Sequence, residues 1–175
     1  MSLARWVLPL AALFAARVLA DTPDKPAAPA APAAPAVGYA TPIGASISLD
    51  AAKKVAAAAV AEAKKNNWFM VVAVVDPGGT LVYYEKADNT QMASAVVAIE
   101  KARSAALYKR PTKVFQDLLA KGAENLRILR LEGAVPVEGG LPLVLDGKLV
   151  GAIGVSGDKS ENDNQCATAG AAHLK

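Results

Sequence analysis

The stretch 139–157 constrains the fold more than any other part of the chain, because it predicts a β-hairpin that carries repeated glycines. Two apolar runs flank Asp146-Gly147. Asp-Gly between apolar runs favours a two-residue turn in which both residues adopt positive φ. The second run contains Gly151, Gly154 and Gly157. Because glycine weakens a strand, its repetition indicates that a helix, a neighbouring subunit or a ligand approaches this backbone closely.

The rest of the chain predicts a second hairpin and several helices. An apolar run at 68–75 is followed by the turn residues Asp76-Pro-Gly-Gly79 and an alternating strand at 80–86. Helical spacing or capping signals mark the ranges 49–65, 91–108, 113–121, 124–131 and 160–174. Hairpins pair their strands antiparallel. We therefore expect an α+β fold in which an antiparallel β-sheet built from two hairpins carries helices on its faces, in the order α-ββ-αα-ββ-α.

Several side chains of the helical ranges receive specific expectations. Small and apolar residues predict the buried stripe of the second helix: Met92, Ala95, Val96, Ile99, Ala102 and Ala106. The charged residues Glu100, Lys101, Arg103 and Lys109 lie off that stripe. Ser48 is placed to cap the first helix, Thr112 to cap the third, and Gly122 to end the third. Ser160 with Asp163 resembles a capping box for the last helix.

The N-terminal residues predict export. Residues 1–20 combine Arg5, an apolar run and the small residues of Val18-Leu19-Ala20, which is typical of a secretory signal peptide. Prolines at every third position between 23 and 35 indicate an extended Ala/Pro-rich linker over 21–38, either a spacer or a simple tail. We expect a single domain at 39–175, located in the periplasm or outside the cell, with no integral membrane segment after cleavage.

Charge and the scarcity of Cys and His exclude several classes of function. Removing residues 1–20 removes two of 19 basic residues and none of 16 acidic ones, so the net charge becomes 17 − 16 = +1. This balance gives no indication of nucleic-acid binding. Cys166 is the single cysteine and His173 the single histidine, so neither an internal disulfide nor a multi-histidine metal site can form.

The sequence contains no catalytic motif that would identify an enzyme. The chain lacks a G-x-S-x-G elbow, a P-loop and an H-E-x-x-H helix. The glycines at 151, 154 and 157 have a spacing of three within a strand, which favours close packing over a nucleotide-binding loop. A serine triad would need His173 as its base, and that residue lies third from the C-terminus. Binding is therefore favoured over catalysis.

Five segments across residues 70–172 together form a family pattern. They are Asp76-Pro-Gly-Gly79, Glu100 to Ala106 with Arg110-Pro111-Thr112, Gly139-Gly140-Leu-Pro-Leu, Gly147 to Gly157, and Asp163-x-x-Cys166-Ala167-x-Ala169-Gly170. This pattern resembles the GlcG/HbpS-like haem-binding family, also called the haem-degrading domain family, which is related to the C-terminal domain of PduO-type proteins. The resemblance implies an antiparallel sheet, homo-oligomers and, in some members, binding of haem or related tetrapyrroles.

Haem would need cationic partners for its propionates, an apolar slot and often an axial ligand. Lys101, Arg103 and Arg110 are cations near Thr112, at a helix end and the start of the next helix, so 101–112 is a candidate propionate site. Solvated helix faces and a cap would explain the same residues without a ligand.

Tyr83 and His173 are further candidates for contact with the haem group. One of Tyr83 and Tyr84 must face outward or into a ligand slot, because they alternate on a strand. His173 is the best axial ligand by its chemistry. Met70, Met92 and Cys166 are more simply explained as core. Aromatic residues make up 5% of the chain, so a haem site would be shallow or lie between subunits.

Three interpretations of function follow. The first is an exported, oligomeric protein that binds haem or a related tetrapyrrole for transport, storage or sensing. The second is an enzyme that breaks down haem or another small molecule. The third is a structural or accessory subunit whose small-residue surfaces serve assembly. Haemin titration beside a mass measurement in solution distinguishes them.

Overall fold

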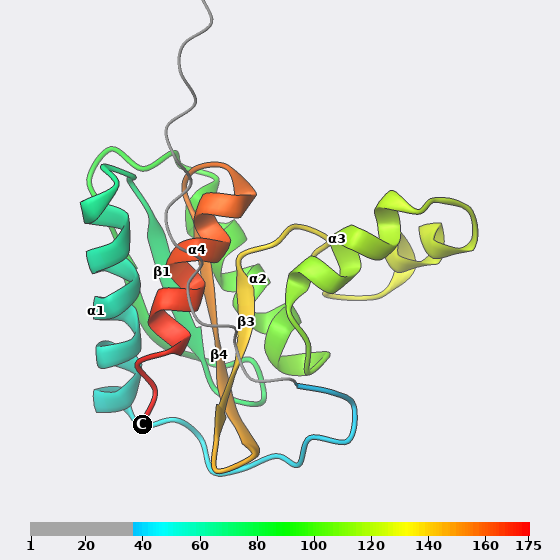
Figure 1. The fold of residues 1–175 in the computed structure, drawn as a ribbon, viewed down its shortest axis with the longest axis horizontal. Helices are drawn as coiled ribbons and strands as arrows, with labels where there is room; N and C mark the ends of the chain where they lie inside the picture. Colours follow the sequence, from blue (N-terminus) through cyan, green and yellow to red (C-terminus); the bar gives the residue numbers. More distant parts are fainter. Residues whose placement is uncertain (1–36) are drawn as a thin grey trace, which may run out of the picture.

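One four-stranded antiparallel sheet forms the centre of residues 37–175, the part of the chain that the computed structural model describes (Figure 1). Its strand order is β2 (Leu81–Lys86), β1 (Val71–Val75), β4 (Lys148–Ser156), β3 (Gly140–Leu145). Both predicted hairpins are present, and antiparallel pairing of β1 with β4 joins them. The predicted α+β fold is therefore confirmed. The predicted signal peptide and nearly all of the predicted linker lie outside the described residues.

The two central strands are buried on both faces, as their apolar sequences require. Every residue of β1 is buried, and β4 is buried after its first residue. Continuous apolar runs are typical of strands that are covered on both sides. The turn between β3 and β4 has φ values of 50° at Asp146 and 73° at Gly147, so both residues adopt the positive φ predicted from Asp-Gly.

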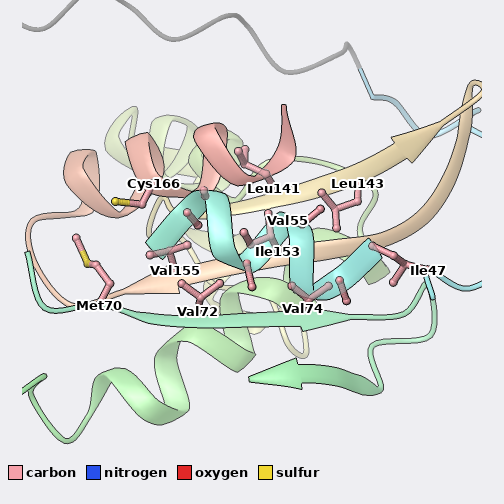
Figure 2. Packing of buried hydrophobic residues seen from close by; sticks show 14 of the residues in the cluster. Ile47, Val55, Met70, Val72, Val74, Leu141, Leu143, Ile153, Val155 and Cys166 are labelled. Atoms are coloured by element: carbon pink, nitrogen blue, oxygen red, sulfur yellow. The ribbon is translucent and has the colours of Figure 1, made fainter. Parts of the chain in front are cut away.

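Two helices cover one face of the sheet and enclose the larger core. They are α1 (Leu49–Lys65) and α4 (Ser160–Ala171). The backbone N–H of Ala51 donates to Ser48 Oγ at 3.2 Å, which confirms Ser48 as the cap of α1. Figure 2 shows side chains from these helices and the sheet meeting in one cluster, among them Val55, Ile153 and Cys166. Met70 and Cys166 are buried there, as predicted.

A single long helix, α2 (Ser94–Leu107), packs on the other face and is rotated relative to the prediction. Its buried face is formed by Ala98, Ala102, Ala105 and Ala106 together with Ser94, Lys101 and Ser104. Two predicted core residues are exposed instead: Met92 to 89% and Val96 to 58%. Met92 precedes the helix, which begins three residues later than predicted.

Close contact with Gly154 explains the rotation of α2. A Cβ atom added at Gly154 would overlap the carbonyl oxygen of Ala98 and lie 2.5 Å from Ala102 N. A helix backbone can approach a strand this closely only through its small side chains. The alanine face of α2 therefore turns toward the sheet, whereas Val96 and Leu107 are exposed.

A helical arm projects from the body of the domain (Figure 1). It consists of α3 (Thr112–Ala120) and the 3₁₀ helix η1 (Ala123–Arg130). Gly122 lies between them with φ 66° and ends α3 as predicted. The arm leaves several apolar side chains exposed: Val114, Leu126, Leu129 and, just after it, Leu131.

Two predicted caps are wrong. Thr112 makes no cap to α3, because its hydroxyl is used by another segment, described below. Ser160 is the first residue of α4, the cap residue is Lys159, and no side chain caps this helix. Asp163 instead bonds to α2 and to the turn before α4. Among residues 37–175, no helix is both long and apolar enough to cross a membrane.

Candidate functional site

Lys101 does not reach solvent, although the sequence predicted that it lies on a charged face. Its side chain is 1% exposed, and Nζ lies 2.7 Å from Asp163 Oδ2 and 3.1 Å from the carbonyl oxygen of Val155. Asp163 Oδ1 accepts from the backbone N–H of Asp158 at 3.2 Å. Burial raises the pKa of the Asp163 carboxyl, while the charge and hydrogen bond of Lys101 act in the opposite direction. The pair links α2 to the start of α4 inside the domain.

Thr112 is likewise an interior residue. It is fully buried, and its Oγ1 accepts a hydrogen bond from the backbone N–H of Gly140 at 3.0 Å. Gly140 begins β3, and a Cβ at that position would lie 2.7 Å from Thr112 Cγ2. The threonine therefore fastens the first turn of α3 to β3, an edge strand of the sheet.

Arg110 anchors the N-terminal segment of the domain. Its guanidinium lies 4.0 Å from the ring centre of Tyr39 and 5.2 Å from that of Phe115. The neighbouring Lys109 donates to the carbonyl oxygens of Tyr39 and Thr41. Cation–π contacts of this kind stabilise the attachment of a chain segment. Arg110 is thus half-buried, and its guanidinium packs against the rings of Tyr39 and Phe115.

Arg103 is the exposed cation of the predicted cluster. It lies on α2, and its Nε–H donates to the carbonyl oxygen of Gly79 in the turn between β1 and β2, at 3.0 Å. A guanidinium carries five N–H donors. The remaining donors have no partner among residues 37–175, so they can bind an anionic group.

A groove of 470 Å³ lies beside Arg103, between α2 and the loop that follows η1. One wall is formed by Glu100, Arg103 and Leu107 of α2, and the other by the loop residues 132–135. Ligand pockets commonly measure about 300–1,000 Å³. The groove combines one cation, the two carboxylates of Glu100 and Glu132, and apolar side chains. Such a surface can hold a flat apolar molecule with a carboxylate at the Arg103 end.

Tyr83 lies on the opposite face of the sheet from this groove. It packs against the core formed with α1 and α4. Its hydroxyl donates to Glu85 Oε2 at 2.9 Å. The pKa of Tyr83 is raised by this hydrogen bond, by burial and by the charge of Glu85, in that order. A second hollow, of 250 Å³, lies nearby between α1 and β2, and Trp68 and Glu85 are among its lining residues.

His173 lies just beyond α4, on the side of the sheet that carries α1. It is exposed, and its Nδ1 lies 3.0 Å from the carbonyl oxygen of Ala169. Within residues 37–175, no three His, Cys, Asp or Glu side chains are grouped to hold a metal ion. The structure therefore places His173 far from the groove at Arg103, on the other face of the sheet.

The structure separates the six predicted site residues. Arg103 lies in the groove, Lys101 and Thr112 lie inside the domain, Arg110 lies under Tyr39, and Tyr83 and His173 lie on the opposite face. Glu100 and Leu107 were not predicted as site residues. They are three residues before and four residues after Arg103, so helical spacing from Arg103 would have found them. The loop at 132–135 carries no comparable signal.

The comparisons with known proteins identify the family. Residues 47–172 match a family model described as "Haem degrading protein HbpS-like". The chain belongs to this HbpS-like family. Its resemblance to GlcG and HbpS, inferred from the five sequence segments, is therefore confirmed. Protein GlcG of Escherichia coli K12 is 39% identical over 83 residues, a match that spans 47% of this chain and 60% of GlcG.

Two solved structures share the fold. A double mutant of HbpS from Streptomyces reticuli is 33% identical with a TM-score of 0.69, covering 84% of this chain and 99% of that one. A structure described as the "PduOC:Heme Complex" is 28% identical with a TM-score of 0.68, covering 74% of this chain and 96% of that one. The domain of this HbpS-like protein thus corresponds to nearly the whole of both neighbours.

Proposed function

We propose that this HbpS-like protein is an exported binding protein that takes haem or a related tetrapyrrole in the groove beside Arg103 and acts as a homo-oligomer. The observation that carries the proposal is the groove itself, in which a cation with unused N–H donors adjoins apolar walls. The haem complex of a neighbour that shares the fold supports the choice of ligand. No nucleic-acid partner is proposed, in keeping with the charge balance.

The groove fits part of a haem group. Arg103 can bind a propionate through a charge-assisted hydrogen bond, and Leu107, Ala134 and Val135 offer apolar contacts to the macrocycle. The residues that line the groove include no His, Met, Cys or Tyr, which are the usual axial ligands of haem iron. A single copy therefore supplies the propionate and edge contacts, and the rest of the site must come from another copy or from solvent.

Two observations support the oligomer and the export. The projecting arm exposes Leu126 and Leu129, and Leu131 just after it is exposed as well. Exposed apolar side chains that lie close together are typical of interfaces between proteins. Export rests on the signal-peptide pattern of residues 1–20. Mass spectrometry of the native protein should find an N-terminus at Asp21, whereas a retained Met1 would contradict export.

Haemin titration of the purified protein tests the ligand. We expect a Soret band shift at micromolar haemin and a loss of affinity of about tenfold in Arg103→Gln, because one charge-assisted hydrogen bond is removed. Lys53→Gln is the control, since Lys53 is exposed on α1, across the sheet from the groove and away from the arm. An unchanged spectrum at micromolar haemin, or equal affinities of the two variants, would contradict the proposed site.

The same titration tests for turnover. The family description contains the words haem degrading, and the sequence offers no catalytic motif. Incubation of the haemin complex with a reductant in air would show breakdown as decay of the Soret band beyond that of free haemin. A stable band is expected for a protein that stores or carries haem.

A further inference from the structure

The exposed surface of α2 consists of four residues. Along this helix, all of which lies in the described part of the chain, Val96, Glu100, Arg103 and Leu107 are exposed and every other residue is buried or half-buried. Their spacings of four, three and four residues place them on one stripe of the helix. The stripe therefore has an apolar side chain at each end and an acid and a base between them.

The two charges of this stripe have no ionic partner within residues 37–175. Glu100 forms no hydrogen bond or ion pair there, and Arg103 donates to the carbonyl oxygen of Gly79 without meeting a carboxylate. The two apolar ends are more than half exposed, Val96 to 58% and Leu107 to 54%. Apolar and charged groups that are exposed together in this way suit a surface that a partner covers.

The stripe is complementary to itself when two copies of α2 lie antiparallel. In the register that places Glu100 of one copy against Arg103 of the other, the two-fold axis passes midway between them. The same register places Val96 against Leu107 of the other copy. At a rise of 1.5 Å per residue, the two apolar contacts lie about 16 Å apart and flank the two ion pairs. A two-fold interface requires self-complementarity of this kind.

We propose that a second copy of this chain packs on the stripe, with the two α2 helices antiparallel about a two-fold axis between Glu100 and Arg103. Opposite charges fix the register. A slip of three residues, close to one helical turn, would place Glu100 against Glu100 or Arg103 against Arg103 of the other copy. Three of the four stripe residues also line the groove of 470 Å³. The second copy would therefore border that groove. The Arg103 guanidinium has five N–H donors, of which one bonds Gly79, so it can meet both Glu100 of the second copy and a ligand carboxylate. The inference deepens the oligomeric part of the proposed function and rests on it.

Cysteine cross-linking tests the register. A mixture of the Val96→Cys and Leu107→Cys variants should form a disulfide-linked dimer under mild oxidation, whereas neither variant alone should do so. The native Cys166 is fully buried and should stay out of the reaction. The register is overturned if the mixture fails to cross-link, or if either variant alone cross-links as efficiently as the mixture.

Charge reversal tests the ion pairs. We expect Glu100→Arg and Arg103→Glu each to raise the dimer dissociation constant by about tenfold or more, measured by size exclusion with light scattering, because like charges then face each other. The double reversal should restore the dimer. Lys53→Glu is the control, because Lys53 is exposed on α1 across the sheet. Single reversals that leave the dimer intact, or a double reversal that fails to restore it, would overturn the interface.

Haemin titration of the same samples separates this inference from the proposed ligand. A dimer that forms and responds to charge reversal without any haemin binding would support the interface and contradict the ligand. Haemin binding by a protein that stays monomeric at every concentration would overturn the interface while leaving the ligand standing.

Discussion

At the scale of single residues, the ion pair between Lys101 and Asp163 stands out because both side chains are almost fully buried. Removing one partner leaves the other charge without compensation, so Lys101→Met should lower the free energy of unfolding by about 3–5 kcal/mol. Urea unfolding at neutral pH measures this loss. Lys101→Met combined with Asp163→Leu should recover much of it, since no charge then stays buried.

The pH dependence of Lys101→Met provides a second measurement of the same pair. Burial raises the pKa of Asp163 in the folded protein, and removal of Lys101 takes away the groups that oppose this rise. A raised folded-state pKa gives stability that is present at low pH and is lost as the pH rises. The difference in free energy of unfolding between Lys101→Met and the unaltered protein should therefore shrink as the pH falls toward about 4. Lys113→Ala, which removes an exposed pair with Asp117, is the control and should change little.

Cys166 should behave as an inert thiol in the folded protein. Burial, followed by the charges of Glu62, Asp163 and Asp158, raises its pKa from an ordinary value of 9.0 to about 12. The native protein should react with a thiol reagent at mildly alkaline pH only as fast as it opens, and the unfolded protein should react at once. Fast labelling of the native protein would contradict this.

The same pKa predicts a loss of stability at high pH. Above its ordinary pKa the thiol ionises in the unfolded chain but stays protonated in the folded one, so the stability that this group provides is lost as the pH rises from 9.0 toward about 12. Cys166→Ala removes the titrating group. Its free energy of unfolding should fall less steeply than that of the unaltered protein over this range, as measured by urea unfolding.

At the scale of elements, the contact between β4 and α2 decides how the helix is oriented. Gly154 lies directly against the backbone of α2, so a larger side chain must push the helix off the sheet. We expect Gly154→Val to lower the free energy of unfolding by about 3 kcal/mol or more and to disturb assembly before it affects binding. Gly38→Ala is the control, because a Cβ there meets no atom within 4 Å. A soluble, normally assembled Gly154→Val protein would contradict this account.

At the scale of the whole molecule, the proposed two-fold contact should depend on salt. The paired charges of Glu100 and Arg103 lie at a surface, where salt screens their attraction. The dimer dissociation constant should therefore rise between low and high NaCl, as followed by light scattering. The double variant Glu100→Gln with Arg103→Gln keeps the apolar contacts and should lose this dependence. An equal salt response in the two proteins would argue against ion pairs at the interface.

Local patterns in the sequence predicted the elements well. The Asp146-Gly147 turn, the apolar run of β1, the Ser48 cap and the end of α3 at Gly122 all depend on neighbouring residues in the chain. The rotation of α2 could not be predicted in this way. The predicted stripe placed Met92 and Val96 in the core beside Ala102 and Ala106. The observed buried face keeps those two alanines but is completed by other alanines and serines together with Lys101.

Only part of the candidate site was predicted, because the contacts of its residues are made with segments that are distant in the sequence. Arg103 lies in the groove, but Lys101, two residues earlier, points to the interior and meets Asp163 from α4. Thr112 was placed at the correct helix end and given the wrong partner, because Gly140 is distant in the sequence. The loop residues 132–135, which form the other wall of the groove, carry no sequence motif. Only the folded structure shows that they lie beside α2.

The sequence by itself determined the order of elements, both hairpins and membership of the family, since each depends on patterns within short segments. Tertiary structure alone decided what the glycines of β4 contact, which face of α2 is buried and which charges stay exposed. The physical reason is close packing: where glycine admits a helix backbone, only small side chains fit between them, and this requirement overrides the preference for burying large apolar residues. Val96, Glu100, Arg103 and Leu107 are left on the surface as a consequence.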